Sequence, residues 1–157
     1  MQFIVKQGAP FTFDAKAFTD FVNTLKFQPD LTLYGPTFDH SIKDPTPNGI
    51  EVAKDNRIII LEGNYVLLNE GEWLNCNKHF DKRLWVDVNE ETAKARLIIR
   101  HVKSGICKNE EEALTRVNDN DLLNGKYARS RLLNDTLIIN SIDDTNFGIW
   151  IPRRIVA

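Results

Sequence analysis

The sequence predicts an α/β fold, in which helices alternate with short apolar strands. Three observations support this prediction: an amphipathic helical pattern over residues 14–27, apolar runs with strand character at 57–61, 83–88 and 136–140, and helix-capping signals between the last two runs. The chain has 157 residues, of which 42% are hydrophobic and 27% are charged. This length and composition are typical of one globular domain, so we expect residues 1–157 to form a single domain.

The first third of the chain predicts one helix and one long loop. Asp14 is a suitable N-cap for the helix at 14–27, and Pro29 follows the apolar pattern as a stop. Residues 35–49 contain three of the six prolines together with glycine and asparagine, which predicts a loop. Four ionisable residues lie close together in the middle of this stretch: Asp39, His40, Lys43 and Asp44. They either orient a hydroxylated substrate or stabilise the turns of the loop.

The string IIILEGNY at 58–65 is the strongest single signal of a site. An apolar run with strand character at 57–61 is followed by Glu62 and Gly63. Ligands of open α/β sheets bind beyond the carboxyl ends of the strands. A carboxylate there can hold Mg²⁺ directly or through water, and glycine lets other groups approach closely. The alternative is that Glu62 caps a neighbouring helix or faces solvent.

A second signal lies on the helix predicted for residues 89–104. Asn89 is its N-cap and follows the strand at 83–88. Arg96, Arg100 and Lys103 fall on one helical face, and such a cationic stripe suits phosphate binding during phosphoryl transfer. The alternative is a solvated face on which these cations pair with the glutamates of the first helical turn, Glu90 and Glu91.

The last third of the chain predicts another helix and a third strand. Asn109 and Glu112 have the spacing of a capping box, so we expect a helix from 109 to about 123 that Gly125 ends. The string VNDNDLLNGK at 117–126 is dense in amides and carboxylates, which suits either ligand binding or the chemistry of a helix end. The strand at 136–140 follows.

Composition and spacing argue against several other functions. A formal charge of −2, from 20 basic and 22 acidic residues, provides no basic field for nucleic acid. The apolar runs are too short to cross a bilayer, and the first residues do not have the pattern of a signal peptide. Cys76 and Cys107 have no CxxC spacing, which predicts free thiols in a reducing compartment, and we expect a cytoplasmic protein. The three histidines lack the spacing of zinc ligands.

Taken together, five strings resemble the P-loop small-molecule kinases of the phosphoribulokinase/uridine kinase group. The likeness is greatest to the fungal Yfh-type ATP-dependent kinases and to the bacterial sugar- or pantothenate-kinase-like proteins. The strings occur in the family's order, and the stretch from the first to the last of them, 8–126, spans most of the chain. They are GAPFTFDAKAF (8–18), FDHSIKDPTPN (38–48), IIILEGNYVLL (58–68), LWVDVNEETAKARLIIRHVKSG (84–105) and NDLLNGK (120–126).

The resemblance implies a reaction, its cofactors and roles for individual residues. The reaction is transfer of a phosphoryl group from ATP, with Mg²⁺, to a hydroxyl of a small-molecule acceptor. Glu62 is similar to the carboxylate beside the P-loop strand, which holds Mg²⁺ through water, and Arg96 and Arg100 are similar to lid arginines that reach the transferring phosphate. By the same resemblance the acceptor is bound by Asp39, His40, Lys43 and Tyr65.

The chain departs from the family at its start. The family begins with a strand, the P-loop and a helix, whereas here only seven residues precede Gly8 and no GxxxxGKS/T motif is present; the one Gly-Lys pair is Gly125–Lys126. We therefore expect a partial P-loop NTPase-type parallel sheet with flanking helices, lacking the N-terminal P-loop strand and helix. The simplest interpretation is the C-terminal part of a longer kinase, from truncation, a gene-model choice or a split gene.

This departure changes what we expect of the chain by itself. Without the phosphate cradle, we expect weak ATP binding and no activity; the alternative is a non-catalytic remnant or interaction module. The missing strand would lie between 58–61 and 84–88, so each of these would have an unpaired edge, and we expect poor solubility or self-association through those edges. Alternatively, the two strands pair directly and close the sheet.

Overall fold

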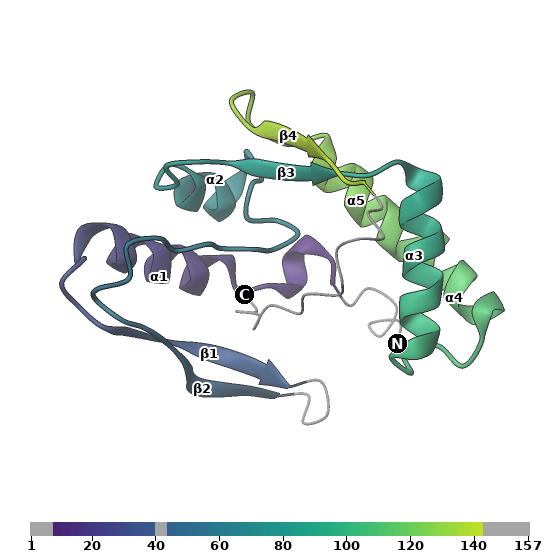
Figure 1. Cartoon of the computed structure of the whole chain (residues 1–157), viewed down its shortest axis with the longest axis horizontal. Helices are drawn as coiled ribbons and strands as arrows, with labels where there is room; N and C mark the ends of the chain where they lie inside the picture. The colour runs from purple at the N-terminus through teal and green to yellow at the C-terminus, as the bar shows by residue number, and fades with distance from the viewer. Residues whose placement is uncertain (1–7, 40–43, 143–157) are drawn as a thin grey trace. The chain divides into compact units, whose positions relative to one another are not determined.

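The computed structural model describes residues 8–39 and 44–142, and these divide into two compact units. The hairpin unit consists of residues 14–81, and the parallel-sheet unit consists of residues 82–142 together with 8–13. Both units combine helices with strands, as the α/β prediction requires (Figure 1). None of the helices in these described ranges is long and apolar enough to cross a membrane.

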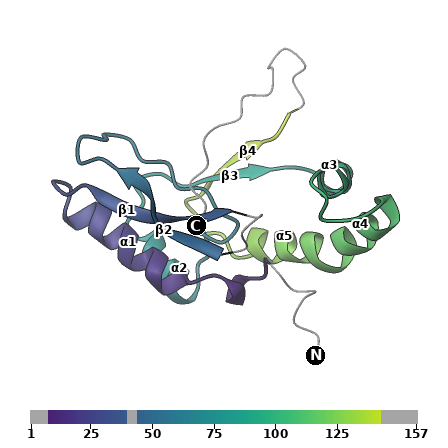
Figure 2. The ribbon, with the colours of Figure 1, turned by 90° about the horizontal axis from the view of Figure 1, so that it is seen from below.

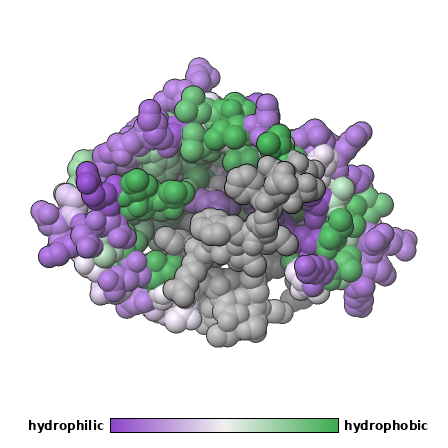
Figure 3. All heavy atoms as spheres, viewed as in Figure 1, coloured by the Kyte–Doolittle hydropathy of each residue, from purple (hydrophilic) through white to green (hydrophobic). Residues whose placement is uncertain are grey.

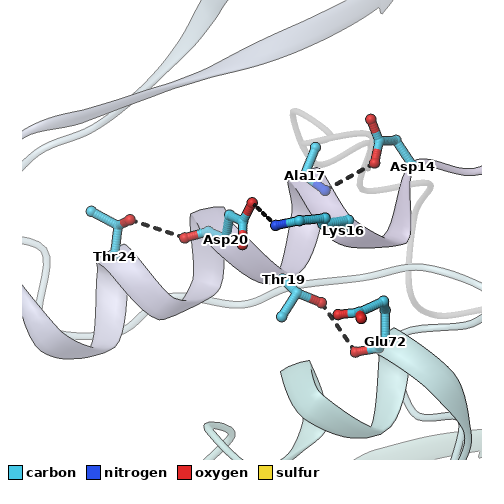
Figure 4. A network of polar contacts seen from close by, with 7 residues as sticks. All are labelled: Asp14, Lys16, Ala17, Thr19, Asp20, Thr24 and Glu72. Atoms are coloured by element: carbon cyan, nitrogen blue, oxygen red, sulfur yellow. Dashed lines mark hydrogen bonds and ion pairs between the residues drawn. The ribbon is translucent and has the colours of Figure 1, made fainter.

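The hairpin unit begins with α1 (Ala15–Phe27), which confirms the first predicted helix. Asp14 is its N-cap, because the Asp14 carboxylate accepts a hydrogen bond from the Ala17 backbone N–H at 2.9 Å (Figure 4). One turn later Lys16 and Asp20 form an exposed i,i+4 ion pair at 2.7 Å. Local capping and side-chain pairing therefore define this end of the helix.

The prediction of a loop at 35–49 is wrong, because most of this stretch forms an antiparallel hairpin. Its strands are β1 (Leu33–Asp39) and β2 (Asp44–Val52), with Phe38 opposite Pro45. A two-stranded hairpin leaves one edge of each strand unpaired, so residues without an N–H are tolerated there. The register shifts between Gly35 and Thr37, around Pro36. The prolines thus shape a strand pair instead of preventing one.

The core of the hairpin unit lies where α1 meets α2 (Gly71–Asn77). The Trp73 indole is buried, with its ring centroid 5.8 Å from that of Phe18 and 6.4 Å from that of Tyr65. The Thr19 hydroxyl donates a hydrogen bond to the Glu72 carbonyl at 3.1 Å and joins the two helices (Figure 4). Figure 2 shows the hairpin β1–β2 beside α1.

Trp73→Ala should strongly destabilise the hairpin unit. Truncating a buried tryptophan removes its packing and leaves a cavity, which costs about 3–5 kcal/mol of unfolding free energy. Urea denaturation followed by circular dichroism measures this loss. Phe27→Ala is the control in the same unit, because Phe27 is an aromatic residue that is 69% exposed; equal losses for the two variants would contradict the packing described here.

The strand predicted at 57–61 is also not formed. After a turn closed by the hydrogen bond from Asn56 N–H to the Ala53 carbonyl, residues 57–64 take part in no hydrogen bond or strand pairing with the described residues. The side chains of Ile58 and Ile60 are 82% and 79% exposed. A strand exists through its neighbours, and no described segment pairs with this one. The suggested direct pairing with 84–88 is likewise absent from the described strands.

The parallel-sheet unit contains the two other predicted strands, which pair in parallel as β3 (Leu84–Asp87) and β4 (Leu137–Asn140). The register places four aliphatic side chains on one face of this sheet, each between 48% and 63% exposed. We call them the β3–β4 apolar face: Leu84, Val86, Leu137 and Ile139. Apolar surface is visible over these strands in Figure 3. Parallel strands are ordinarily covered on both faces, so this surface is unusual.

The helices of the parallel-sheet unit confirm the capping predictions and correct one helix end. α3 (Glu90–Lys103) begins where the Asn89 side chain accepts from the Thr92 N–H at 2.8 Å, and α4 (Glu110–Arg116) begins with the same bond from Glu112 to Asn109. A π-helical turn, η3 (Val117–Asp121), joins α4 to α5 (Leu122–Arg129). Gly125 was expected to end the helix but lies inside α5. An interior glycine costs only about 1 kcal/mol relative to alanine, too little to end a packed helix.

Candidate functional site

One hydrogen bond joins the carboxyl ends of β3 and β4, and a second joins the end of β4 to α3. The Ser141 N–H, directly after β4, donates to the Asp87 carbonyl at 2.6 Å. The Ser141 hydroxyl in turn accepts a hydrogen bond from Arg96 Nη1 on α3 at 2.9 Å. A predicted phosphate-binding arginine is therefore attached to the edge of the sheet at which α/β proteins bind ligands.

Asp87 is the acidic centre of this edge. Trp85 Nε1–H donates to its Oδ1 at 2.9 Å, and Arg129 Nε lies 3.3 Å from the same oxygen. The Trp85 hydrogen bond, with a smaller contribution from Arg129, holds the pKa of Asp87 below its ordinary value. Nearby, Lys126 and Glu90 form an ion pair at 2.8 Å, so α5 is joined both to the end of β3 and to the start of α3.

Asp87→Asn should lower stability at neutral pH and have little effect in acid. Because the folded state depresses the pKa of Asp87, its stabilising contribution is present above the ordinary aspartate pKa of about 4 and is lost as pH falls through the lower folded value. Melting temperatures of wild type and variant between neutral and acidic pH measure this convergence. The carboxyl carbon NMR shift of Asp87 should report a higher pKa in Trp85→Phe; an unchanged pKa would contradict the stated cause.

The cations of α3 differ in their surroundings. Arg96 is bound to Ser141, whereas the exposed Arg100 side chain forms no hydrogen bond or ion pair with the described part of the chain. The alternative prediction paired these cations with glutamates of the same helix, but Glu90 pairs with Lys126 of α5. The Arg100 guanidinium therefore remains available to an anionic ligand.

The pair His101–Asp121 was not predicted from the sequence. His101 is only 4% exposed, and its Nε2 lies 2.7 Å from Asp121 Oδ2 in the π-helical turn. The spacing Ala93, Leu97, His101 along the inward face of α3 was the available signal. The pair joins α3 to η3.

The predicted residues of the hairpin unit are only partly described. Glu62 is exposed on the segment without hydrogen bonds, and its carboxylate has no partner among the described residues. Tyr65 is 1% exposed and packs against Trp73, so in this structure its ring belongs to the core; substrate binding by Tyr65 stays a prediction. Asp39 ends β1, whereas His40 and Lys43 lie outside the described residues.

Among the predicted site residues that the structure describes, Glu62 is the one that bears on the fit of Mg²⁺. Within residues 8–39 and 44–142 no group of three or more acidic, histidine or cysteine side chains is arranged to hold a metal ion. Protein-bound Mg²⁺ commonly takes one or two carboxylates together with water and substrate phosphates. The accessible carboxylate of Glu62 is compatible with Mg²⁺ that arrives with a nucleotide.

The two cysteines of the described chain are free thiols and both are buried. Burial raises the pKa of Cys76 to about 12, so this thiol is protonated at neutral pH and is a poor nucleophile. Neither residue contributes to the candidate site.

Comparison with known proteins places the chain among kinases. No family model matches it. It is 38% identical over 136 residues to a Schizosaccharomyces pombe protein provisionally named a uridine kinase, covering 87% of this chain and 58% of that protein. It is 40% identical over 124 residues to the ATP-dependent kinase-like protein notR′ of Aspergillus versicolor, covering 77% of this chain and 72% of that one.

Solved structures with a similar fold are also described as kinases. The crystal structure of YFH7 from Saccharomyces cerevisiae, described provisionally as a P-loop containing kinase with a circular permutation, matches with a TM-score of 0.78 and 26% identity over 87% of this chain and 50% of its own. A protein of Silicibacter sp. TM1040, provisionally described as a fructose transport system kinase, matches with a TM-score of 0.77 and 29% identity, over 87% of this chain and 64% of its own.

These matches define an α/β protein of the P-loop kinase class. More particularly, the chain belongs to the family that contains the ATP-dependent kinase-like protein of A. versicolor and the YFH7 kinases. The chain spans little more than half the length of the S. pombe relative and half of the YFH7 structure. The comparisons therefore establish the family of the chain, and its activity is proposed below.

Proposed function

We propose that this chain supplies the lid helix and acceptor-binding parts of an enzyme that transfers a phosphoryl group from ATP to a hydroxyl of a small metabolite. The observation that carries the proposal is the position of Arg96 and Arg100 on α3, which starts directly after the carboxyl end of β3. Phosphoryl transfer depends mainly on positioning and on neutralising charge at the transferring group. Guanidinium groups suit this task because they donate several hydrogen bonds while remaining charged.

The proposed mechanism gives the residues separate tasks. Arg96, held at Ser141, binds a phosphate oxygen in the ground state, and Arg100 reaches the phosphoryl group as charge develops. Glu62 would hold Mg²⁺ through water; when bound, the ion supplies charge neutralisation at the phosphates. Asp39, His40 and Lys43 would orient the acceptor hydroxyl.

The chain alone should bind Mg·ATP with a Kd above about 1 mM. The sequence has no GxxxxGKS/T string, and the backbone N–H groups of that loop provide most of the phosphate cradle in such kinases. Isothermal titration calorimetry measures the affinity. Micromolar binding of Mg·ATP to the 157-residue chain would contradict both this prediction and the expectation that the chain alone is inactive.

The proposed function is tested in a chimera. In the S. pombe relative, the segment that matches this chain is replaced by the corresponding residues of this chain. Phosphoryl transfer from ATP is then measured with nucleosides, sugars and pantothenate as acceptors. We expect one acceptor class to be phosphorylated. A chimera that folds and binds ATP yet phosphorylates nothing, while the unaltered S. pombe protein is active in the same assay, would contradict the proposal.

A second candidate function is a non-catalytic interaction module. It is favoured by the β3–β4 apolar face and by the segment 57–61, which pairs with no described strand, because both expose apolar side chains of the kind that bind partners. The DNA upstream of the Met1 codon separates the two functions. A GxxxxGKS/T string encoded there in any frame would support the kinase over a free-standing module.

A further inference from the structure

Two asparagine–glycine dipeptides occur in the sequence, and they lie in different structural contexts. Asn48–Gly49 belongs to β2, whereas Asn124–Gly125 lies inside α5. An asparagine that precedes glycine is prone to lose its side-chain amide, because the glycine has no side chain to hinder attack by its own backbone nitrogen. The two contexts therefore predict different chemical stability for two identical dipeptides.

Asn48 lies at the irregularity of the hairpin. The register shift places three residues of β2, 47–49, opposite the single residue Pro36 of β1. Asn48 has a φ of 57°, a left-handed conformation that asparagine tolerates better than most residues. Asn48 and Gly49 are both exposed, and the Asn48 side chain has no hydrogen bond within residues 8–39 and 44–142. Water therefore reaches this dipeptide, and no described residue holds the Asn48 amide in place.

Packing between the strands favours glycine after Asn48. A Cβ added to Gly49 would collide with the side chain of Thr37 on β1. The close approach of β1 and β2 at this point thus has its own structural reason. The reactive dipeptide is a consequence of how the hairpin packs.

The second dipeptide is protected by its helix. Backbone N–H groups inside an α-helix are hydrogen-bonded along the helix, which keeps the Gly125 nitrogen from attacking its neighbour. The half-buried Asn124 side chain is also engaged, because its Nδ2 donates to Asn120 Oδ1 at 3.4 Å. Reaction at Asn124 therefore requires local opening of α5.

We propose that Asn48 is a site of spontaneous deamidation, which converts it to aspartate and isoaspartate in the folded protein. The Gly49 backbone nitrogen loses its proton to water or a buffer base and attacks Asn48 Cγ. The new C–N bond closes a cyclic succinimide, and the Cγ–Nδ2 bond breaks to release ammonia. Water then opens the ring, at Cγ to give aspartate or at the backbone carbonyl carbon to give isoaspartate. The net reaction is hydrolysis of an amide, so it needs no oxidant or reductant.

Deamidation changes the hairpin in two ways. Either product adds a negative charge to β2, which pairs with the strand that ends at the predicted acceptor-binding residue Asp39. Isoaspartate also lengthens the backbone of β2 by one methylene group, at the point where its register already departs from that of β1. The modification thus alters both the charge and the strand pairing of this hairpin.

The test follows both dipeptides in the 157-residue chain by peptide mass spectrometry. The native protein is incubated at neutral pH in heavy-oxygen water, so that each new acid carries the label. Asn48 should deamidate at least about tenfold faster than Asn124, since α5 must open before Asn124 reacts. In urea, which unfolds the helix and the hairpin, the ratio of the two rates should fall close to one.

Asn48→Gly is the blocked variant, because glycine adopts a positive φ without strain and has no amide to lose. It should form no labelled acid at position 48 and should keep the wild-type rate at Asn124. Asn48→Asp is the reference for the aspartate product, with which part of the aged wild-type protein should co-elute on ion exchange. Equal rates at the two dipeptides in the native protein, or a preference for Asn48 that persists unchanged in urea, would overturn the inference.

Discussion

Arg100→Ala in the chimeric kinase should lower kcat about 100-fold or more and change KM little. The Arg100 side chain has no partner among the described residues, so it gains an interaction only when phosphate charge is near. A group that acts mainly in the transition state affects kcat and kcat/KM together, and losing one such donor ordinarily costs two to three orders of magnitude. Steady-state kinetics at saturating Mg·ATP gives both constants.

Lys108→Ala is the control for this variant, since Lys108 is an exposed cation in the turn between α3 and α4. It should leave both constants unchanged. A variant of Arg100 in which only KM rises would assign this residue to ground-state binding of the nucleotide. That outcome would leave the kinase proposal intact but would reverse the tasks proposed for Arg96 and Arg100.

The isolated chain should self-associate, and lysines placed on its exposed apolar positions should return it to a monomer. Ile58 and Ile60 are exposed on a segment whose backbone has no partner in the described structure, and the β3–β4 apolar face exposes four further aliphatic side chains. Such surfaces are templates for association. Ile58→Lys with Ile60→Lys, and separately Val86→Lys with Ile139→Lys, should shift the mass measured by chromatography with light scattering.

Ile99→Lys serves as the control, because Ile99 is 66% exposed on α3 and belongs to neither of these two sets of residues. It should leave the association unchanged. A clean wild-type monomer with one sharp melting transition above about 50 °C, typical of mesophilic domains, would show that these exposed apolar residues do not drive association. The interpretation of 57–61 as a strand without its neighbour would then be wrong.

Local signals predicted helices well and strands less well. Asp14, Asn89 and Asn109 all cap the helices they were expected to cap, because a cap depends on residues only three positions away. The prediction of a strand at the apolar run 57–61 was wrong, because a strand depends on a partner elsewhere in the chain. The hairpin β1–β2 was missed because prolines were interpreted as loop signals, although a two-stranded hairpin has free edges where they are allowed.

The candidate site was predicted in part for the same reason. Arg96 and Arg100 share a face because helical spacing fixes it. Ser141 and Asp121 reach α3 from distant positions in the sequence, and no spacing rule places them there. Glu62 was expected at the end of a strand, and it instead follows an extended segment that no other described segment pairs with.

The π-helical turn η3 determines in which direction the side chains of α5 point. One extra residue in a helical turn rotates the following side chains by about 100° relative to an uninterrupted α-helix. In this chain the rotated positions are those of Lys126 and Arg129, which pair with Glu90 and Asp87. A single-residue deletion within 117–121 would therefore turn both cations away from their carboxylates at once. The extra residue of the π-helical turn therefore sets the direction in which the cations of α5 point, and this direction allows them to pair with β3 and with the start of α3.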